Sequence, residues 1–266
     1  MKRFLGRIPD THRASDLRFA RYADKAKLIA ATEAPAAPNW ESVFLESGTR
    51  PKRDRDPLGN NRAGCCVFSA PAHDINLIRQ FGGAHVPEVT AEMVLAEYAK
   101  RTGWDPVTGA NDNGYYIRVM LEIWRTEGLF GTKLLAYCAV DWNDPDEVRL
   151  ALWLGGGLIG GYDLPLASQD QQDVSGRQLW YVPEGGWKAG HGPGTWGGHA
   201  LYKFGTSPGG DQDNSWGEST ISTPGWRKDC CSELWLPIVD IWVAGAKAPN
   251  GFALDDLLAD VRARGV

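Results

Sequence analysis

One stretch constrains the fold more than any other, because it places a thiol at the start of a helix. Residues 59–70 read Gly-Asn-Asn-Arg-Ala-Gly-Cys-Cys-Val-Phe-Ser-Ala. A turn rich in glycine and asparagine precedes two cysteines and an apolar run follows them, which is the pattern of a loop entering a helix. A helix N-terminus carries partial positive charge and unpaired N–H donors, so it lowers the pKa of a cysteine. The stretch therefore predicts a nucleophilic thiol.

Two segments far downstream supply the polar partners that such a thiol needs. They read Gly-Gly-His-Ala at 197–200 and Asn-Ser-Trp-Gly at 214–217. Together the three segments resemble the papain-like cysteine peptidase superfamily, in which a cysteine opens the central helix, a strand histidine is the base and an asparagine orients it. The order Cys, His, Asn agrees with that family, and the 133 residues from Cys66 to His199 lie within its separation of roughly 130–150.

The resemblance implies a catalytic role for four residues. Cys66 is the expected nucleophile and His199 the base that holds its proton. Asn214 is expected to accept the imidazole N–H and fix its tautomer. Asn60 lies six residues before Cys66, where the family has an oxyanion-hole glutamine, so its amide is expected to donate N–H to the oxyanion.

Two tryptophans are expected at the same site. Trp216 follows in the Asn-Ser-Trp-Gly segment, and the resemblance implies that it shields the histidine–asparagine hydrogen bond from water. Trp196 precedes the Gly-Gly-His-Ala segment and is assigned to binding together with Trp216.

The choice between the two adjacent cysteines stays open. Gly64 followed by two cysteines matches the Gly-Ser-Cys pattern of the family and favours Cys66, as does the amide side chain six residues upstream. Against this, Cys65 and the following Val-Phe-Ser-Ala read as a shortened Cys-Trp-Ala-Phe-Ser run, which favours Cys65. Val67 also replaces the tryptophan that usually follows the nucleophile.

The composition excludes several other classes of protein. Hydrophobic residues make up 43% and charged residues 23%, which are ordinary globular values. A net charge of −5 without a basic stripe argues against general nucleic-acid binding. No apolar run approaches the ~20 residues of a membrane span, and the basic start lacks the apolar region of a secretion signal. We therefore expect neither nucleic-acid nor membrane partners.

The cysteine pattern bears on redox state and on metals. Two adjacent pairs and Cys138 give an odd count of five without the spacing of a disulfide framework, which predicts reduced thiols in a cytoplasmic product. No Cys-x-x-Cys or His-x-x-x-His spacing occurs, so we expect no metal and no other cofactor.

The chain divides into an arm and one domain. Residues 1–57 are predicted to form an extended basic N-terminal arm and linker, and residues 58–266 an α+β, papain-like domain. Its helical part covers about 58–155, its antiparallel sheet part about 156–225 and its C-terminal helices about 226–266. Helices are expected at 66–79, 90–103, 226–243 and 253–264, with one from 113 or 114 to 128 and one that begins at 144. Strands are expected at 133–140, 155–162, 178–182, 198–204 and 214–221.

The resemblance implies a thiol peptidase or amidase whose substrate is a peptide or a cell-wall peptide. Residues 6–12, 58–60, 64–66 and 197–200 also look like papain-like proteins encoded in phages and prophages. That similarity implies an alternative, a non-catalytic structural protein of a virion head or tail that docks on neighbouring subunits by its arm. A third interpretation is a binder of cell-wall glycan or peptide through tryptophan-rich loops. The expected location is the cytoplasm of the producing cell, with assembly into a virion in the phage case.

Overall fold

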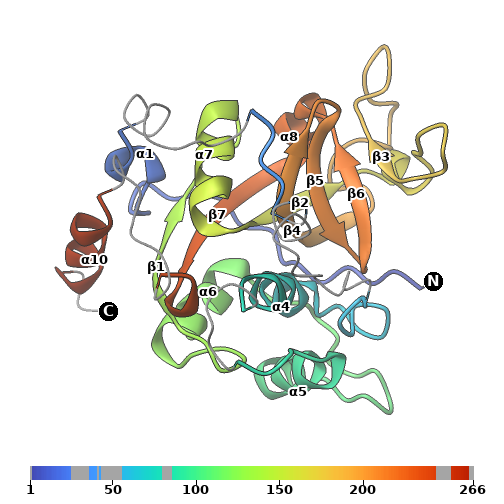
Figure 1. Ribbon diagram of the computed structural model, residues 1–266. Coiled ribbons are helices and arrows are strands. Elements are labelled where there is room, and N and C mark those ends of the chain that lie inside the picture. Colours follow the sequence, from blue (N-terminus) through green and yellow to red (C-terminus); the bar gives the residue numbers. More distant parts are fainter. Residues whose placement is uncertain are drawn as a thin grey trace.

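The computed structural model describes residues 2–24, 36–40, 42, 56–79, 86–243 and 253–263. Within these ranges the chain forms one seven-stranded sheet, and three helices, α4 (Cys66–Ile78), α5 (Ala91–Thr102) and α6 (Ile117–Thr126), gather on one side of it (Figure 1). The predicted α+β class is thus confirmed. Residues 25–35, 41 and 43–55 of the predicted arm and linker lie outside the described residues.

The sheet has the strand order β1-β7-β2-β4-β5-β6-β3. Its strands are β1 (Leu134–Ala139), β2 (Leu158–Leu164), β3 (Leu179–Trp180), β4 (Gly197–Ser207), β5 (Gly210–Ser215), β6 (Glu218–Ser222) and β7 (Cys231–Val239). Neighbouring strands are antiparallel except β3 and β6. The remaining described helices are α1 (Phe19–Tyr22), α7 (Pro145–Gly155), α8 (Pro224–Cys230), α9 (Asp240–Val243), α10 (Leu254–Ala263) and the 3₁₀ turn Leu166–Gln169.

Local sequence signals explain where the helices begin and end. The Thr90 side chain caps α5, and Gly103 ends it in the left-handed conformation with φ 73°. Asp144 caps α7 by accepting from two backbone N–H groups, with proline at the first helical position. All thirteen residues of α4 are buried, and Pro71 lies inside this helix. The helix begins at Cys66, the expected first residue, and continues through Pro71.

Two predicted elements are wrong. The strand expected over 214–221 is a hairpin: Ser215 pairs with Glu218, and Trp216 and Gly217 form a two-residue turn with φ of 51° and 77°, as in a type I′ turn. The helix expected over 226–243 contains the long strand β7 instead. That strand lies between β1 and β2 and is buried along nearly its whole length, so it lacks the alternating pattern that marks a half-buried strand.

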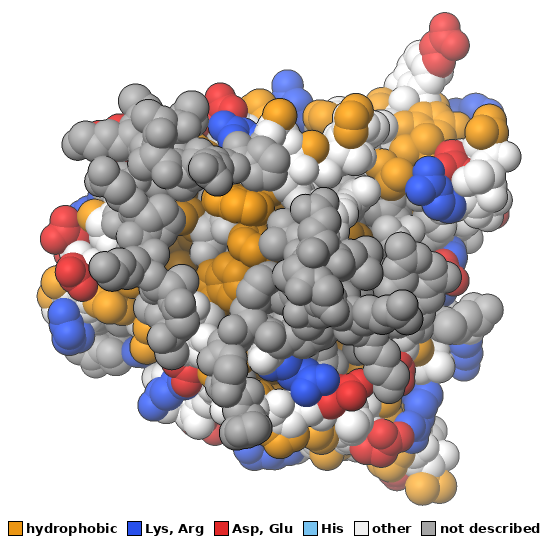
Figure 2. Space-filling view, in the orientation of Figure 1, with side chains coloured by type: hydrophobic (Ala, Val, Ile, Leu, Met, Phe, Trp, Pro, Cys, Tyr) orange, Lys and Arg blue, Asp and Glu red, His pale blue; other side chains and the backbone are white. Residues whose placement is uncertain are grey.

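Most tryptophans belong to the core. Of the twelve, all of which the structure describes, seven are buried and five are partly buried against the core. On the face shown in Figure 2, the charged side chains of the described residues are of both signs and intermingled. Among the helices of the described ranges, none is both long enough and apolar enough to span a bilayer.

Residues 2–24 of the predicted arm lie against the protein's own domain. Arg7 and Tyr115 form a parallel bridge, and Arg18 bridges to Ala139 at the edge of β1. Arg21 pairs with Asp260 of α10 at 3.0 Å. These contacts hold residues 2–24 against the protein's own domain. Docking of the arm on other subunits stays a prediction.

Candidate functional site

Cys66 opens α4, the helix that packs directly beneath β4 (Figure 1). Its side chain is only 1% exposed, and its Sγ accepts a hydrogen bond from the Ala200 backbone N–H at 3.4 Å. Cys65 lies instead among core groups, with its Sγ 3.5 Å from the Ser69 Oγ and 3.9 Å from the Leu58 carbonyl. Of the two adjacent thiols, Cys66 is therefore the one that contacts the histidine-bearing strand.

His199 lies on β4 next to Ala200 and has one polar partner in the described structure. Its Nε2 is 3.1 Å from the Ser215 Oγ. The Nδ1 atom is buried and has no hydrogen-bond partner among the described residues. The Trp216 ring stacks on the imidazole at a centroid distance of 4.1 Å and 12°. One ring nitrogen is thus held by a hydroxyl, one face by an indole, and the other nitrogen is left without a partner.

The aromatic wall continues beyond Trp216. The Trp196 ring lies 5.4 Å from that of Trp216 at 30°. Trp216 is also one of the few non-glycine residues with a positive φ, and such strained backbone is often found where a site needs a particular side-chain direction. Trp216 thus contacts the histidine, and Trp196 contacts Trp216.

Strand register decides which residue of the 214–217 segment contacts His199. In the β4–β5 ladder Asn214 lies opposite Tyr202, and Asp213 lies opposite Lys203. His199 and Lys203 share one face of β4 because side chains alternate along a strand. The Lys203–Asp213 ion pair of 2.8 Å marks that face on β5, so Ser215 belongs to it and Asn214 to the opposite face.

Asn214 accordingly contacts α4 rather than His199. Its Nδ2 is 3.3 Å from the Nδ1 of His73. The expected hydrogen bond between Asn214 and His199 is therefore absent from the described structure. Ser215, which the motif did not point to, contacts His199 in its place. The two-residue turn at Trp216 and Gly217 was the signal that could have revealed it, because hairpin geometry sets the register of both strands.

Asn60 is buried close to the turn that leads into α4. It is 2% exposed, and its Nδ2 donates to the Ala63 carbonyl at 3.0 Å. A primary amide carries two N–H bonds, so this contact uses only one of them. The side chain is fixed by the turn itself.

An N-terminal segment, residues 4–8, crosses the site, and we call it the strap. The Phe4 N–H points to the Asn60 carbonyl at 3.4 Å, and the Phe4 carbonyl accepts from the Trp216 Nε1 at 2.9 Å. Further along, the Ile8 N–H donates to Tyr115 at 2.9 Å, and the Tyr115 N–H donates to Gly6 at 2.7 Å. The strap is therefore bonded to the helical side and to the sheet side of the site.

Glycines make this close crossing possible. A Cβ placed at Gly6 would overlap the Gly64 carbonyl, and one placed at Gly114 would overlap the Gly6 carbonyl. The Arg7 N–H donates to the Gly198 carbonyl at 3.1 Å, and a Cβ at Gly198 would overlap the Arg7 carbonyl. Backbone is thus packed directly on backbone, which only glycine allows.

The protonation states follow from this enclosure. Burial raises the pKa of the Cys66 thiol to about 11, although N–H groups of Ala200 and Gly6 and the charge of Arg7 act in the other direction. Burial, together with the charges of Arg3 and Arg7, lowers the pKa of His199 to about 3. At neutral pH the site therefore holds a thiol and a neutral imidazole rather than an ion pair.

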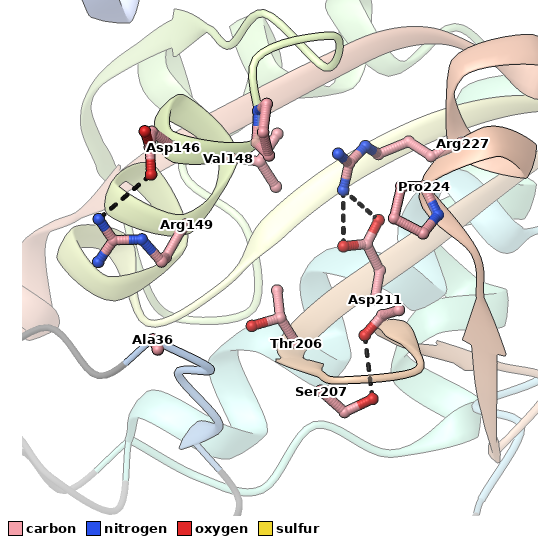
Figure 3. A pocket seen from close by; sticks show the side chains of 11 residues that line it. Ala36, Asp146, Val148, Arg149, Thr206, Ser207, Asp211, Pro224 and Arg227 are labelled. Atoms are coloured by element: carbon pink, nitrogen blue, oxygen red, sulfur yellow. Dashed lines mark hydrogen bonds and ion pairs between the residues drawn. The ribbon is translucent and has the colours of Figure 1, made fainter.

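A separate pocket lies far from the thiol. It has a volume of about 560 Å³ and lies between the start of α7, the β4–β5 turn at Thr206 and the start of α8 (Figure 3). Thr206 is six residues beyond Ala200 on β4, which corresponds to about 20 Å along the strand. The arginines that line it are paired: Arg227 with Asp211, and Arg149 with Asp146. No group of three metal-ligating side chains occurs in the described ranges.

Comparison with known proteins identifies the fold. No protein-family model matches the chain, and no curated protein sequence matches it significantly. Among solved structures, xylellain, a cysteine protease from Xylella fastidiosa, is similar at a TM-score of 0.61 and 15% identity, covering 89% of this chain and 96% of xylellain. The procathepsin B S9 of Trypanosoma congolense has a TM-score of 0.56 at 12% identity, covering 93% and 87%.

A third similar structure is the digestive procathepsin L 3 of the Tenebrio molitor larval midgut. Its TM-score is 0.51 at 14% identity, and the match covers 85% of this chain and 75% of the procathepsin. The three neighbours are cysteine proteases or their precursors by name, and they confirm the predicted papain-like fold.

Proposed function

Starting from a papain-like fold, we propose that the protein is a thiol peptidase or amidase with Cys66 as nucleophile and His199 as base. The observation that supports this most is the pairing of Cys66, at the N-terminus of α4, with the backbone N–H of the residue that follows His199. The unpartnered His199 Nδ1 is available to take the thiol proton. The sequence resemblance and the neighbouring structures support the same reaction class.

The reaction proceeds through an acyl-enzyme. The thiol proton passes to His199, the sulfur of Cys66 forms a bond to the substrate carbonyl carbon, and the carbonyl oxygen becomes an oxyanion. The C–N bond then breaks, and the leaving amine takes the proton from the imidazolium. Water, deprotonated by the same imidazole, hydrolyses the thioester and restores the thiol. The free N–H of the Asn60 amide is proposed to donate to the oxyanion.

We assign the orientation of the imidazole to Ser215 instead of Asn214. The Ser215 hydroxyl can accept the Nε2–H at 3.1 Å, which leaves Nδ1 as the acceptor that faces the reaction. Trp216 covers this bond and Trp196 extends the covering. Asn214 is assigned to the packing of β5 on α4 through His73.

Catalysis requires that the strap leave the site. With the strap in place Cys66 and His199 are each 1% exposed, and a substrate carbonyl cannot reach the sulfur. Withdrawal of residues 4–8 would rehydrate both groups and remove the charges of Arg3 and Arg7 from the imidazole. Both changes favour a thiolate–imidazolium pair.

The test is hydrolysis of a fluorogenic peptide library by the full chain carrying Arg7→Ala, which removes the side-chain anchor of the strap, and by further single variants in that background. We expect activity to be lost in Cys66→Ala and His199→Ala and retained in Cys65→Ala. Ser215→Ala should lower kcat and move the pH profile, Ser215→Thr should restore both, and Asn214→Ala should leave the profile in place. Activity that survives Cys66→Ala would refute the proposal.

The closed site favours a second candidate, a non-catalytic protein that keeps the papain-like fold. A buried thiol whose pKa is about 11 is inert at neutral pH, and a structural subunit of a virion would need no opening. This alternative predicts that the library is not hydrolysed under any condition and that removal of residues 1–38 abolishes assembly.

A further inference from the structure

The side chain of Arg7 is enclosed in a site built for a guanidinium group. It is 0% exposed, and its Nε donates to Glu233 at 2.9 Å. One terminal nitrogen donates to Asp163 at 3.0 Å, and the other donates to the Ser232 hydroxyl at 2.5 Å and the Asp10 carbonyl at 2.8 Å. Three nitrogens thus meet acceptors in the planar fork that distinguishes arginine from lysine.

Apart from the Asp10 carbonyl, which belongs to the N-terminal segment, the acceptors of this site are carried by the sheet. Glu233 belongs to β7 and Asp163 to β2, which are neighbouring strands. The Trp235 Nε1 donates to the second oxygen of Glu233 at 2.8 Å, which fixes the carboxylate. Gly161 leaves the space, since a Cβ there would overlap both Arg7 and Glu233. Rigid strands and a bonded carboxylate are the marks of a preorganised subsite.

The guanidinium site and the reacting groups are contacted by adjacent residues of the strap. The Arg7 N–H donates to the carbonyl of Gly198, which precedes His199. The preceding residue, Gly6, lies against the turn that leads to Cys66, since a Cβ on it would overlap the Gly64 carbonyl, and its N–H acts to lower the pKa of the Cys66 thiol. An extended backbone that crosses the thiol at a glycine therefore delivers its next side chain to Glu233 and Asp163.

We propose that Glu233 and Asp163 form an arginine subsite for peptide substrates, and that Arg7 of the strap occupies it in the closed state. Cleavage of a bound peptide rests on the proposed function, whereas binding of the peptide does not. When the strap leaves, Glu233 becomes a buried carboxylate without its cation, which is costly until another guanidinium binds. The substrate class is an extended peptide with glycine followed by arginine, because the Gly64 carbonyl leaves no room for a side chain at the first position.

The same contacts explain specificity against close analogues. Citrulline has the shape of arginine without its charge and places a carbonyl oxygen where a terminal nitrogen would stand. Norleucine offers no donor at all. Norleucine would leave Glu233 without a guanidinium partner. Citrulline would keep the Nε–H bond to Glu233 but lose the positive charge and one terminal donor, and a site built to bond a buried polar group discriminates strongly against a partner that lacks it.

The experiment uses the full chain carrying Arg7→Ala, which empties the subsite, with Arg7→Met as a second variant that keeps the volume of the side-chain stem. Acetyl-Leu-Gly-Arg-Ile-amide and its citrulline and norleucine analogues are titrated, and protection of Cys66 from iodoacetamide is measured by mass spectrometry. We expect the arginine peptide to protect Cys66 at a concentration at least about tenfold lower than the citrulline or norleucine peptide needs, which is the difference that one charge-assisted hydrogen bond makes. Glu233→Gln in the same background should abolish the preference.

Glu218→Gln is the matched control, because Glu218 pairs with Arg3 at 3.2 Å on the exposed side of the strap, and it should leave the preference intact. Equal protection by the arginine and citrulline peptides in both Arg7 variants would overturn the proposal. Arginine-selective protection without cleavage would establish the subsite and count against the hydrolase. Cleavage without arginine preference would support the hydrolase and refute the subsite.

Discussion

Replacing Asp74 by asparagine should stabilise the protein at neutral pH. Asp74 lies on α4 and is fully buried, and neither carboxylate oxygen has a hydrogen-bond partner within normal distance in the described structure. Burial raises the pKa of this carboxyl from 3.8 to about 8, while the nearby Tyr202 hydroxyl acts weakly in the other direction. The folded protein therefore holds Asp74 protonated at a pH where the unfolded chain has it ionised.

The sign and the size of the effect follow from linkage. Because the folded pKa is raised, stability is fully present below pH 3.8 and is lost as pH rises towards 8. Each pH unit in this interval costs about 1.4 kcal/mol, so wild type loses roughly 4 kcal/mol by pH 7 relative to a neutral isostere. Asparagine is close to such an isostere and escapes the loss.

Urea unfolding followed by tryptophan fluorescence at pH 4.5, 6 and 7.5 measures the difference. We expect Asp74→Asn to gain stability over wild type as pH rises, by on the order of 1 kcal/mol per pH unit. Asp170→Asn, at an exposed position, is the matched control. A difference between Asp74→Asn and wild type that does not change with pH would refute the account of Asp74.

Two further substitutions test the strap and the buried ion network. Gly6→Ala should push the strap off Gly64, because the added Cβ overlaps the carbonyl there. Overpacking costs about 1–3 kcal/mol, so alkylation of Cys66 should speed up about tenfold or more. An unchanged alkylation rate would mean that the strap does not limit access to the thiol. Lys203→Met should destabilise by about 3–5 kcal/mol in urea, because the fully buried ammonium is 2.8 Å from Asp213; a loss below about 1 kcal/mol would show that the pair is not needed.

The elements that the sequence predicted well are those with local signals. The caps at Thr90 and Asp144 and the glycine after α5 marked helices that the structure contains. The strands expected at 133–140 and 198–204 correspond to β1 (Leu134–Ala139) and β4 (Gly197–Ser207). The motif spacing pointed to Cys66 and His199; the Cys66 sulfur accepts from the N–H of Ala200, the residue after His199, and the catalytic roles of both stay predictions.

The features that could not be predicted depend on long-range register and packing. Ser215 rather than Asn214 contacts His199 because a two-residue turn sets which face of β5 each side chain joins, and a one-residue change in register moves every side chain to the other face. Nothing local marks β7, which is buried on both sides between β1 and β2. The path of the strap is likewise set by distant glycines at 64, 114 and 198.

The central claim is that Cys66, opposed by His199, is the reactive thiol of a site that the strap closes. Site-resolved alkylation by iodoacetamide from pH 6 to pH 10 tests it in wild type, in Arg7→Ala and in Arg7→Ala with His199→Ala. We predict that Cys66 reacts slowly in wild type because its pKa is about 11, and near neutral pH in Arg7→Ala, where it outpaces all four other cysteines. Loss of His199 should move that reactivity back to higher pH. If Cys66 in Arg7→Ala reacts no faster than the buried Cys138, and without dependence on His199, the account is contradicted.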